Sequence, residues 1–263
     1  MRSIADFIMR GRMQATLVVV GSAVMPLLFW LSAAAAGLVL LRRGASDVVG
    51  ILVWAVLPAA LWWYLGNSNV FMVLAGTLVL AQVLRATGSW TWVLLTSVVL
   101  GVVFAQVLTV FSADVLEDIS QLMREGFKAY AAESNVPVEQ FADVQVAWIA
   151  VLPGYLASSL QVFCVLCLVL ARYWQAALYN PGGFALEFRA IRLQPAVAIA
   201  LLLGVLLAPV AGTPFAMWAP LCTVPLFFAA LALGHGLVKI RQLSGFWLAV
   251  SYTHLTLPTK RIV

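Results

Sequence analysis

The chain has 263 residues, of which 64% are hydrophobic and 10% are charged, and its formal net charge is +5. A soluble globular domain typically carries about 25% charged residues, so the composition excludes an ordinary soluble protein. Long apolar runs, rather than short alternating segments, exclude a transmembrane β-barrel and predict an all-α, polytopic transmembrane helical bundle in a lipid bilayer. The basic residues are spread over separate loops, so no nucleic-acid partner is expected.

The first apolar run, residues 13–41, is interrupted at Met25-Pro26 and followed by two arginines. A straight helix of this length would measure roughly 43 Å, whereas the hydrocarbon layer is ~30 Å thick. Pro26 lacks a backbone donor and disfavours helix at Met25, which indicates a helical hairpin with arms from about Ile4 and over 27–41. One long kinked span is the alternative, because prolines occur inside transmembrane helices.

The charges favour the hairpin. Outside the segment 112–143 and the C-terminal tail, basic residues far outnumber acidic ones, and they form five clusters: the N-terminus, 42–43, 85, 172–192 and 239–241. The positive-inside rule places such clusters in the cytoplasm. Only the hairpin brings all five to one side, so we expect a multi-pass protein of the bacterial cytoplasmic (inner) membrane with a cytoplasmic N-terminus.

About eight membrane segments are therefore expected: the two hairpin arms, then 46–65, 70–84, 90–111, 145–171, 195–211 and 217–238. We expect the sixth to be interrupted at Pro153-Gly154, and residues 172–194 to form a loop.

The segment 112–143 holds seven of the ten acidic residues. Apolar side chains recur in it at spacings of three and four, at Leu116, Ile119, Met123, Phe127 and Tyr130. This period predicts an external amphipathic helix whose apolar stripe lies on the bundle or at the membrane interface.

Few residues in the apolar runs can carry chemistry. His235 lies near the end of its run and indicates an interfacial histidine more than a proton relay. Cys164 and Cys167 have redox or metal spacing, but they lie in mid-span without a neighbouring charge and read as buried side chains. With no catalytic motif, we expect neither an enzyme nor a metal or cofactor site.

Gln106 and Gln161 are the best candidates for a ligand site, because an uncharged amide is costly in lipid unless it faces a partner. A ligand pocket predicts that they converge with Trp148 and Tyr155 near the outer face. Bonding between helices is the alternative, and it corresponds to a structural or assembly protein of the inner membrane without a ligand.

Two further segments carry a family resemblance. Residues 37–44 (GLVLLRRG) follow a first helix and a proline, and residues 183–195 (GFALEFRAIRLQP) place acidic and basic residues before a proline and a span. Both resemble the YybS-like bacterial membrane proteins, a family without an assigned function. Its layout is similar to that of substrate-binding subunits of energy-coupling-factor vitamin transporters.

This resemblance implies a component that binds a small-molecule substrate, has no ATPase of its own and docks on a membrane partner subunit. In that arrangement Ala33 and Gly37 would contribute to docking, because their small-xxx-small spacing suits close helix contact within the chain or with a partner.

The chain ends with an abrupt change of composition. Residues 244–250 resemble the start of a further span, but 251–263 are polar and threonine-rich. This tail resembles translated sequencing-adapter read-through, so we expect 1–250 to form a single membrane domain and 251–263 to be non-native. A genuine cytoplasmic tail is the alternative.

Overall fold

The structure is a computed structural model that describes residues 2–134, 137–242, 244, 246 and 253. The regular elements in this part of the chain are all helices, which confirms the all-α class. They are α1 (Arg2–Arg10), α2 (Arg12–Val24), α3 (Phe29–Arg43), α4 (Ala45–Tyr64), α5 (Asn69–Thr87), α6 (Trp90–Phe111), α7 (Ala113–Ser134), the 3-10 turn η1 (Val138–Phe141), α8 (Ala142–Tyr179), α9 (Gly183–Arg189), α10 (Pro195–Leu207), α11 (Thr213–Ala216) and α12 (Trp218–Ile240). The predicted non-native tail lies outside the described residues, apart from Thr253.

The prediction of about eight membrane segments is too high. In the described chain, five helices are long and apolar enough to cross a membrane: α4, α5, α6, α8 and α12. The other three predicted membrane segments correspond to shorter helices: α2 and α10 have 13 residues each, and α3 has 15. At ~1.5 Å per residue these helices reach only about 20–22 Å, less than the ~30 Å hydrocarbon layer. The apolar runs in the sequence are longer than these helices because each run also includes apolar residues of the adjoining turns.

The first apolar run forms a helical hairpin, as predicted, although its first arm begins at Arg12 rather than near Ile4 because the chain breaks at Gly11. Helix α2 ends at Val24 and α3 begins at Phe29, on either side of the break at Met25-Pro26. The arms pack against each other, and the Arg43 guanidinium donates to the Met9 carbonyl at 2.6 Å. Since Met9 precedes α2 and Arg43 ends α3, this bond fixes the arms as antiparallel.

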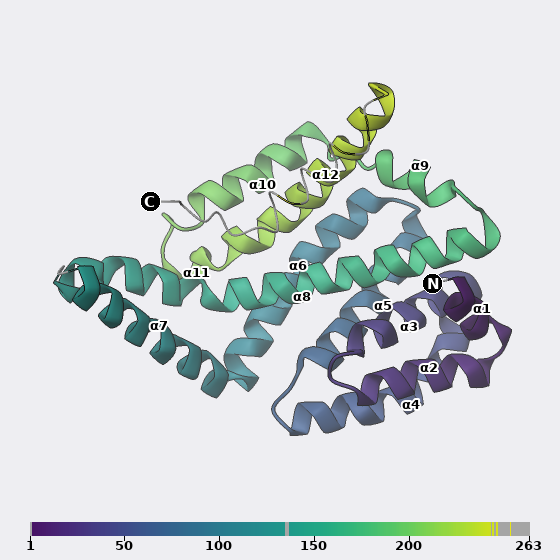
Figure 1. The fold of residues 1–263 in the computed structure, drawn as a ribbon, viewed down its shortest axis with the longest axis horizontal. Coiled ribbons are helices and arrows are strands. Elements are labelled where there is room, and N and C mark those ends of the chain that lie inside the picture. The colour runs from purple at the N-terminus through teal and green to yellow at the C-terminus, as the bar shows by residue number, and fades with distance from the viewer. Residues whose placement is uncertain (1, 135–136, 243, 245, 247–252, 254–263) are drawn as a thin grey trace.

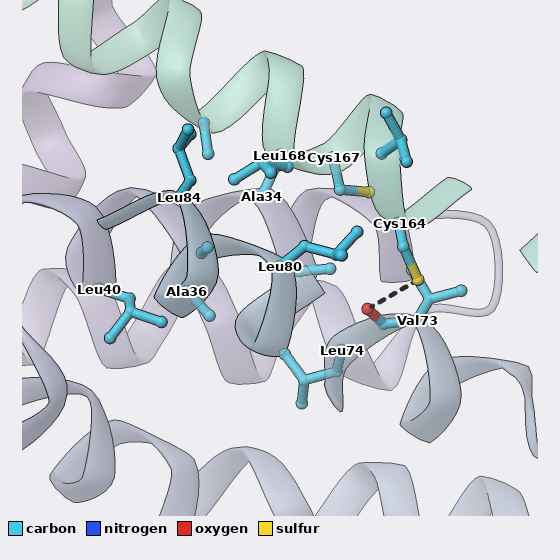
Figure 2. Packing of buried hydrophobic residues seen from close by; sticks show 14 of the residues in the cluster. Ala34, Ala36, Leu40, Val73, Leu74, Leu80, Leu84, Cys164, Cys167 and Leu168 are labelled. Atoms are coloured by element: carbon cyan, nitrogen blue, oxygen red, sulfur yellow. Dashed lines mark hydrogen bonds between the residues drawn. The ribbon is translucent and has the colours of Figure 1, made fainter. Parts of the chain in front are cut away.

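Helices α3 and α8 form the centre of the bundle. Nine consecutive residues of α3, from Ser32 to Leu40, are buried, and α3 packs on α2, α4, α5 and α8. Figure 2 shows α3 alanines against leucines of α5 and α8. The small side chains of 33–37 explain this placement, because only they let a helix approach neighbours on every side.

Helix α8 runs the length of the molecule, with α10–α12 on one side and α1–α5 on the other (Figure 1). It is continuous over 38 residues, so the predicted interruption at Pro153-Gly154 is wrong. Prolines are tolerated inside membrane helices when neighbours satisfy the freed backbone groups. The predicted loop 172–194 is also corrected, because α8 continues to Tyr179 and α9 occupies Gly183–Arg189.

The amphipathic helix is confirmed as α7. Residues of its predicted stripe are partly buried, and the Phe127 ring lies 6.2 Å from that of Phe141. Helix α7 contacts the ends of α6 and α8, and it forms an acute angle with the first part of α8 (Figure 1).

Contacts bring the basic clusters to one end of the bundle, which we call the basic end. Arg43 donates to the Met9 carbonyl beside the N-terminal cluster, and Arg85 donates to the Leu40 carbonyl at 2.6 Å. The Arg42 guanidinium lies 4.1 Å from the Tyr179 ring centroid, and α12, which carries Lys239, contacts α9. The opposite end, where α7 lies, is called the acidic end. This arrangement is the one that the hairpin interpretation requires.

Candidate ligand-binding site

A cavity of about 370 Å³ lies inside the acidic end, and we call it the roofed cavity. Its walls come from five regions that are distant in sequence: the start of α3, the turn 66–69, the end of α6, the first turns of α7 and the middle of α8. They contribute Phe29, Gly66, Asn67, Ser68, Asn69, Leu108, Ser112, Val115, Leu116, Ile119, Leu156, Ser159, Leu160 and Phe163. Its size is within the range of about 300–1,000 Å³ that is typical of small-molecule sites.

The turn between α4 and α5 supplies most of the polar wall. Gly66 has a φ of +87°, which glycine adopts without a Cβ penalty, and it reverses the chain after α4. The Asn67 side-chain oxygen then accepts a bond from the Asn69 backbone at 3.1 Å, which holds the turn. Polar backbone and side chains are thereby placed at the start of α5, beside the cavity.

Helix α7 covers the cavity from the side opposite α8. Leu116 and Ile119, two members of its predicted apolar stripe, line the cavity and are partly buried. Helix α7 packs on α6 and α8 at the cavity's edge, while its acidic residues Glu117 and Asp118 remain exposed. The amphipathic pattern therefore produces a roof with an apolar inner side and an acidic outer side.

The described residues that line the roofed cavity carry no formal charge. Its polar groups are the asparagine and serine side chains of the 66–69 turn, together with Ser112 and Ser159. The Ser159 hydroxyl donates to the Tyr155 carbonyl at 3.1 Å, so its oxygen retains acceptor capacity. Such a lining suits an uncharged molecule with an apolar body and one polar end.

Gln161, a predicted ligand residue, lies away from this cavity. It is 1% exposed, and its amide nitrogen donates to the Ser97 hydroxyl at 2.9 Å and the Leu221 carbonyl at 3.3 Å. These bonds connect α8 with α6 and α12. The structure thus places Gln161 in interhelical bonding, which was the alternative to ligand contact.

Trp148 and Tyr155 do come together, with stacked rings whose centroids are 5.9 Å apart. They line an apolar groove of about 460 Å³ between α8, α10 and α12, and both are nearly half exposed. Gln106 is outside this groove and has only a 4.0 Å contact with the Met217 sulfur. The four predicted ligand residues therefore do not converge on one cavity.

Ala33 and Gly37, the predicted docking pair, are buried inside the chain. A Cβ on Gly37 would lie 3.3 Å from the Ala171 Cβ and 3.5 Å from the Thr77 methyl group, so the backbone of α3 approaches both α8 and α5 closely. The pair thus serves helix packing within the chain, which was one of its two predicted uses.

Cys164, Cys167 and His235, the other residues considered for chemistry, lie in surroundings that do not indicate a reactive site. Cys164 and Cys167 are buried, and their thiols approach backbone carbonyls of Val73 and Trp30. The His235 ring packs edge-on against Phe188 at 5.5 Å. In the described chain, no group of three or more histidine, cysteine or acidic side chains is arranged to hold a metal ion.

Sequence reasoning missed the residues that line the roofed cavity. The one signal in the sequence is the polar run Gly66-Asn67-Ser68-Asn69, whose residue types are typical of a turn and do not by themselves indicate a ligand site.

The geometry defines an α-helical, membrane-embedded protein with a partly open cavity of mixed polarity at its acidic end. No protein-family model, no curated protein and no solved structure matches this chain. The resemblance to YybS-like proteins therefore stays a prediction, and function is argued from the cavity alone.

Proposed function

We propose that this protein is a membrane-embedded binding component that takes up a small, uncharged molecule in the roofed cavity. The observation that supports it is the cavity itself, whose volume of about 370 Å³ is within the range typical of small-molecule sites. A space of this size, with serine and asparagine groups on one wall and leucine and phenylalanine on the other, matches the usual composition of a ligand site.

The site lies at the end of the bundle that the charge distribution predicts to be external. A ligand would therefore enter from outside the cell, next to α7. In this proposal the protein has no ATPase of its own, and any ATP-driven transport would use a separate partner subunit.

The test is the small-molecule content of the protein purified from its native membrane. Leu116→Trp places a bulky ring inside the cavity, while Leu122→Trp adds the same ring on the side of α7 where Leu122 is 70% exposed. We expect mass spectrometry of the denatured protein to release an uncharged molecule from wild type and Leu122→Trp, and to release much less from Leu116→Trp.

A structural or assembly protein is the second candidate function, and the bonding of Gln161 between three helices favours it. That function predicts no released molecule from either folded variant. An equal release from both variants would also exclude the roofed cavity as the site.

A further inference from the structure

A second hollow, about 500 Å³ in volume, lies at the basic end and is lined by α12, by Ala198 of α10 and by residues of the segment 189–193, which begins at the last residue of α9. Figure 1 shows α9, α10 and α12 near one another. We call it the arginine groove. Its floor is formed by small residues, including Ala198, Ala230 and Gly236, and its sides by longer apolar ones such as Leu233. Small residues between long ones leave a trough, and α10 and α12 pack against each other without filling it.

The mouth of the groove is positively charged. Arg189 and Arg192 are the charged side chains among the described residues that line it. Arg189 donates its Nε hydrogen to the Ala185 carbonyl at 2.7 Å, which orients the guanidinium, and the Arg192 carbonyl accepts from Thr91 at 2.9 Å, which fixes the backbone. Across the described chain, neither guanidinium makes a salt bridge.

The nearest acidic residue in sequence does not neutralise them. Glu187 forms a two-pronged ion pair with Arg172, through the Nε atom at 2.9 Å and the Nη2 atom. The two groove arginines therefore remain available to an anion, and Lys239 and Arg241 at the end of α12 add positive potential nearby.

We infer that the arginine groove binds an anionic phospholipid, with the phosphate at Arg189 and Arg192 and an acyl chain in the trough. A guanidinium pairs with phosphate through parallel hydrogen bonds. The positive potential of this end favours a lipid with a net negative charge over a zwitterionic one. The trough follows α12 from Leu226 to Ile240, a length of roughly 21 Å, which exceeds the ~15 Å depth of one leaflet. Basic pockets between membrane helices have the chemistry that anionic lipid headgroups require.

The lipid accounts for both features of the groove. A free phosphate would use the arginines but leave the trough unexplained, and an apolar partner helix would fill the trough but leave the two arginines at its mouth without an anion. Leu233 is 62% exposed on the trough's side, so an acyl chain has direct access from the bilayer.

The experiment is native mass spectrometry of the full chain in detergent, titrated with phosphatidylglycerol or with phosphatidylcholine of the same acyl chains. We expect wild type to retain phosphatidylglycerol preferentially. Arg189→Gln with Arg192→Gln should lower the apparent affinity by about tenfold or more, as the loss of charge-assisted hydrogen bonds implies. Arg124→Gln, which removes the same charge on α7 and lies outside the groove, is the matched control and should behave like wild type.

Two further measurements keep the inference falsifiable. Ala230→Leu fills the trough and should weaken phosphatidylglycerol binding while both arginines are present; unchanged binding would overturn the acyl-chain placement. Stabilisation by inorganic phosphate equal to that by phosphatidylglycerol would show an anion site and overturn the lipid assignment. Equal retention of both lipids by wild type would overturn it as well. If the double variant does not fold, Arg192→Gln alone, at an exposed side chain, serves as the test.

Discussion

The two ends of the bundle are held together in different ways. At the basic end, arginine side chains bond to backbone carbonyls of neighbouring helices, as in Arg43 to Met9 and Arg85 to Leu40. At the acidic end, the helix ends are held by the indole of Trp62, which donates to the Ala23 carbonyl at 3.1 Å, and by the Asn67 turn.

This difference shows that the basic residues have two roles. They are the charges that the positive-inside rule counts, and their side chains also donate to backbone carbonyls near the C-terminal ends of α1 and α3. Long arginine side chains therefore connect the helices at the basic end, whereas at the acidic end the charges lie on the outer side of α7 and the roofed cavity is lined by uncharged residues.

The largest effect is expected from a test of orientation, that is, whether the acidic end faces the outside of the cell and the basic end faces the cytoplasm. Gln121→Cys lies on the exposed side of α7 and Ser46→Cys is exposed at the basic end. We expect a membrane-impermeant thiol reagent, added to intact cells, to label Gln121→Cys and to leave Ser46→Cys unlabelled. The opposite pattern would invert the topology.

The wild-type protein is the blank in that experiment, because its three cysteines are buried. Ser120 is a poor choice for the same labelling, since it is 4% exposed and bonds to the Leu116 carbonyl.

The next largest effect is expected at the basic end, where Gly44 ends α3 with a φ of +99°. A Cβ at this position would lie 2.8 Å from the Arg85 Nη1 atom, which is bonded to Leu40. Gly44→Ala thus adds backbone strain and displaces the guanidinium, and we expect a loss of about 2–3 kcal/mol in thermal or denaturant unfolding in detergent.

Gly88→Ala is the matched control, because Gly88 also has a positive φ, +64°, but nothing lies within 4 Å of its Cβ position. Strain alone should then lower stability by about 1 kcal/mol. Equal losses in the two variants would show that the arginine bonds do not stabilise the basic end.

Much of the fold could be predicted from local sequence. The break at Met25-Pro26 follows from proline chemistry, and the stripe of α7 follows from its period, so both were placed correctly. The number of spans was overestimated because hydrophobicity alone does not show where a helix ends. For α10, the apolar run continues beyond the helix to Ala211, although the last helical residue is Leu207.

The site could not be predicted in the same way. The roofed cavity depends on the spacing of five regions, from Phe29 to Phe163, and no local pattern encodes that spacing. Gln161 was selected because it is polar in an apolar run, which is correct, but polarity does not distinguish a helix partner from a ligand. Only the positions of Ser97 and Leu221 make that distinction.

The smallest effect is expected midway between the two ends, at Gln161. Gln161→Leu keeps a similar volume and removes the bonds to Ser97 and Leu221, but it also removes a buried side-chain oxygen that has no partner among the described residues. These changes oppose each other, so we expect a loss of only about 1 kcal/mol in unfolding free energy. Gln106→Leu, at an exposed side chain with one weak sulfur contact, should be close to neutral.

Since Gln161 does not line the roofed cavity, both variants should release the same amount of bound small molecule as wild type. A Gln161→Leu protein of unchanged stability that has lost its small molecule would instead assign Gln161 to ligand binding.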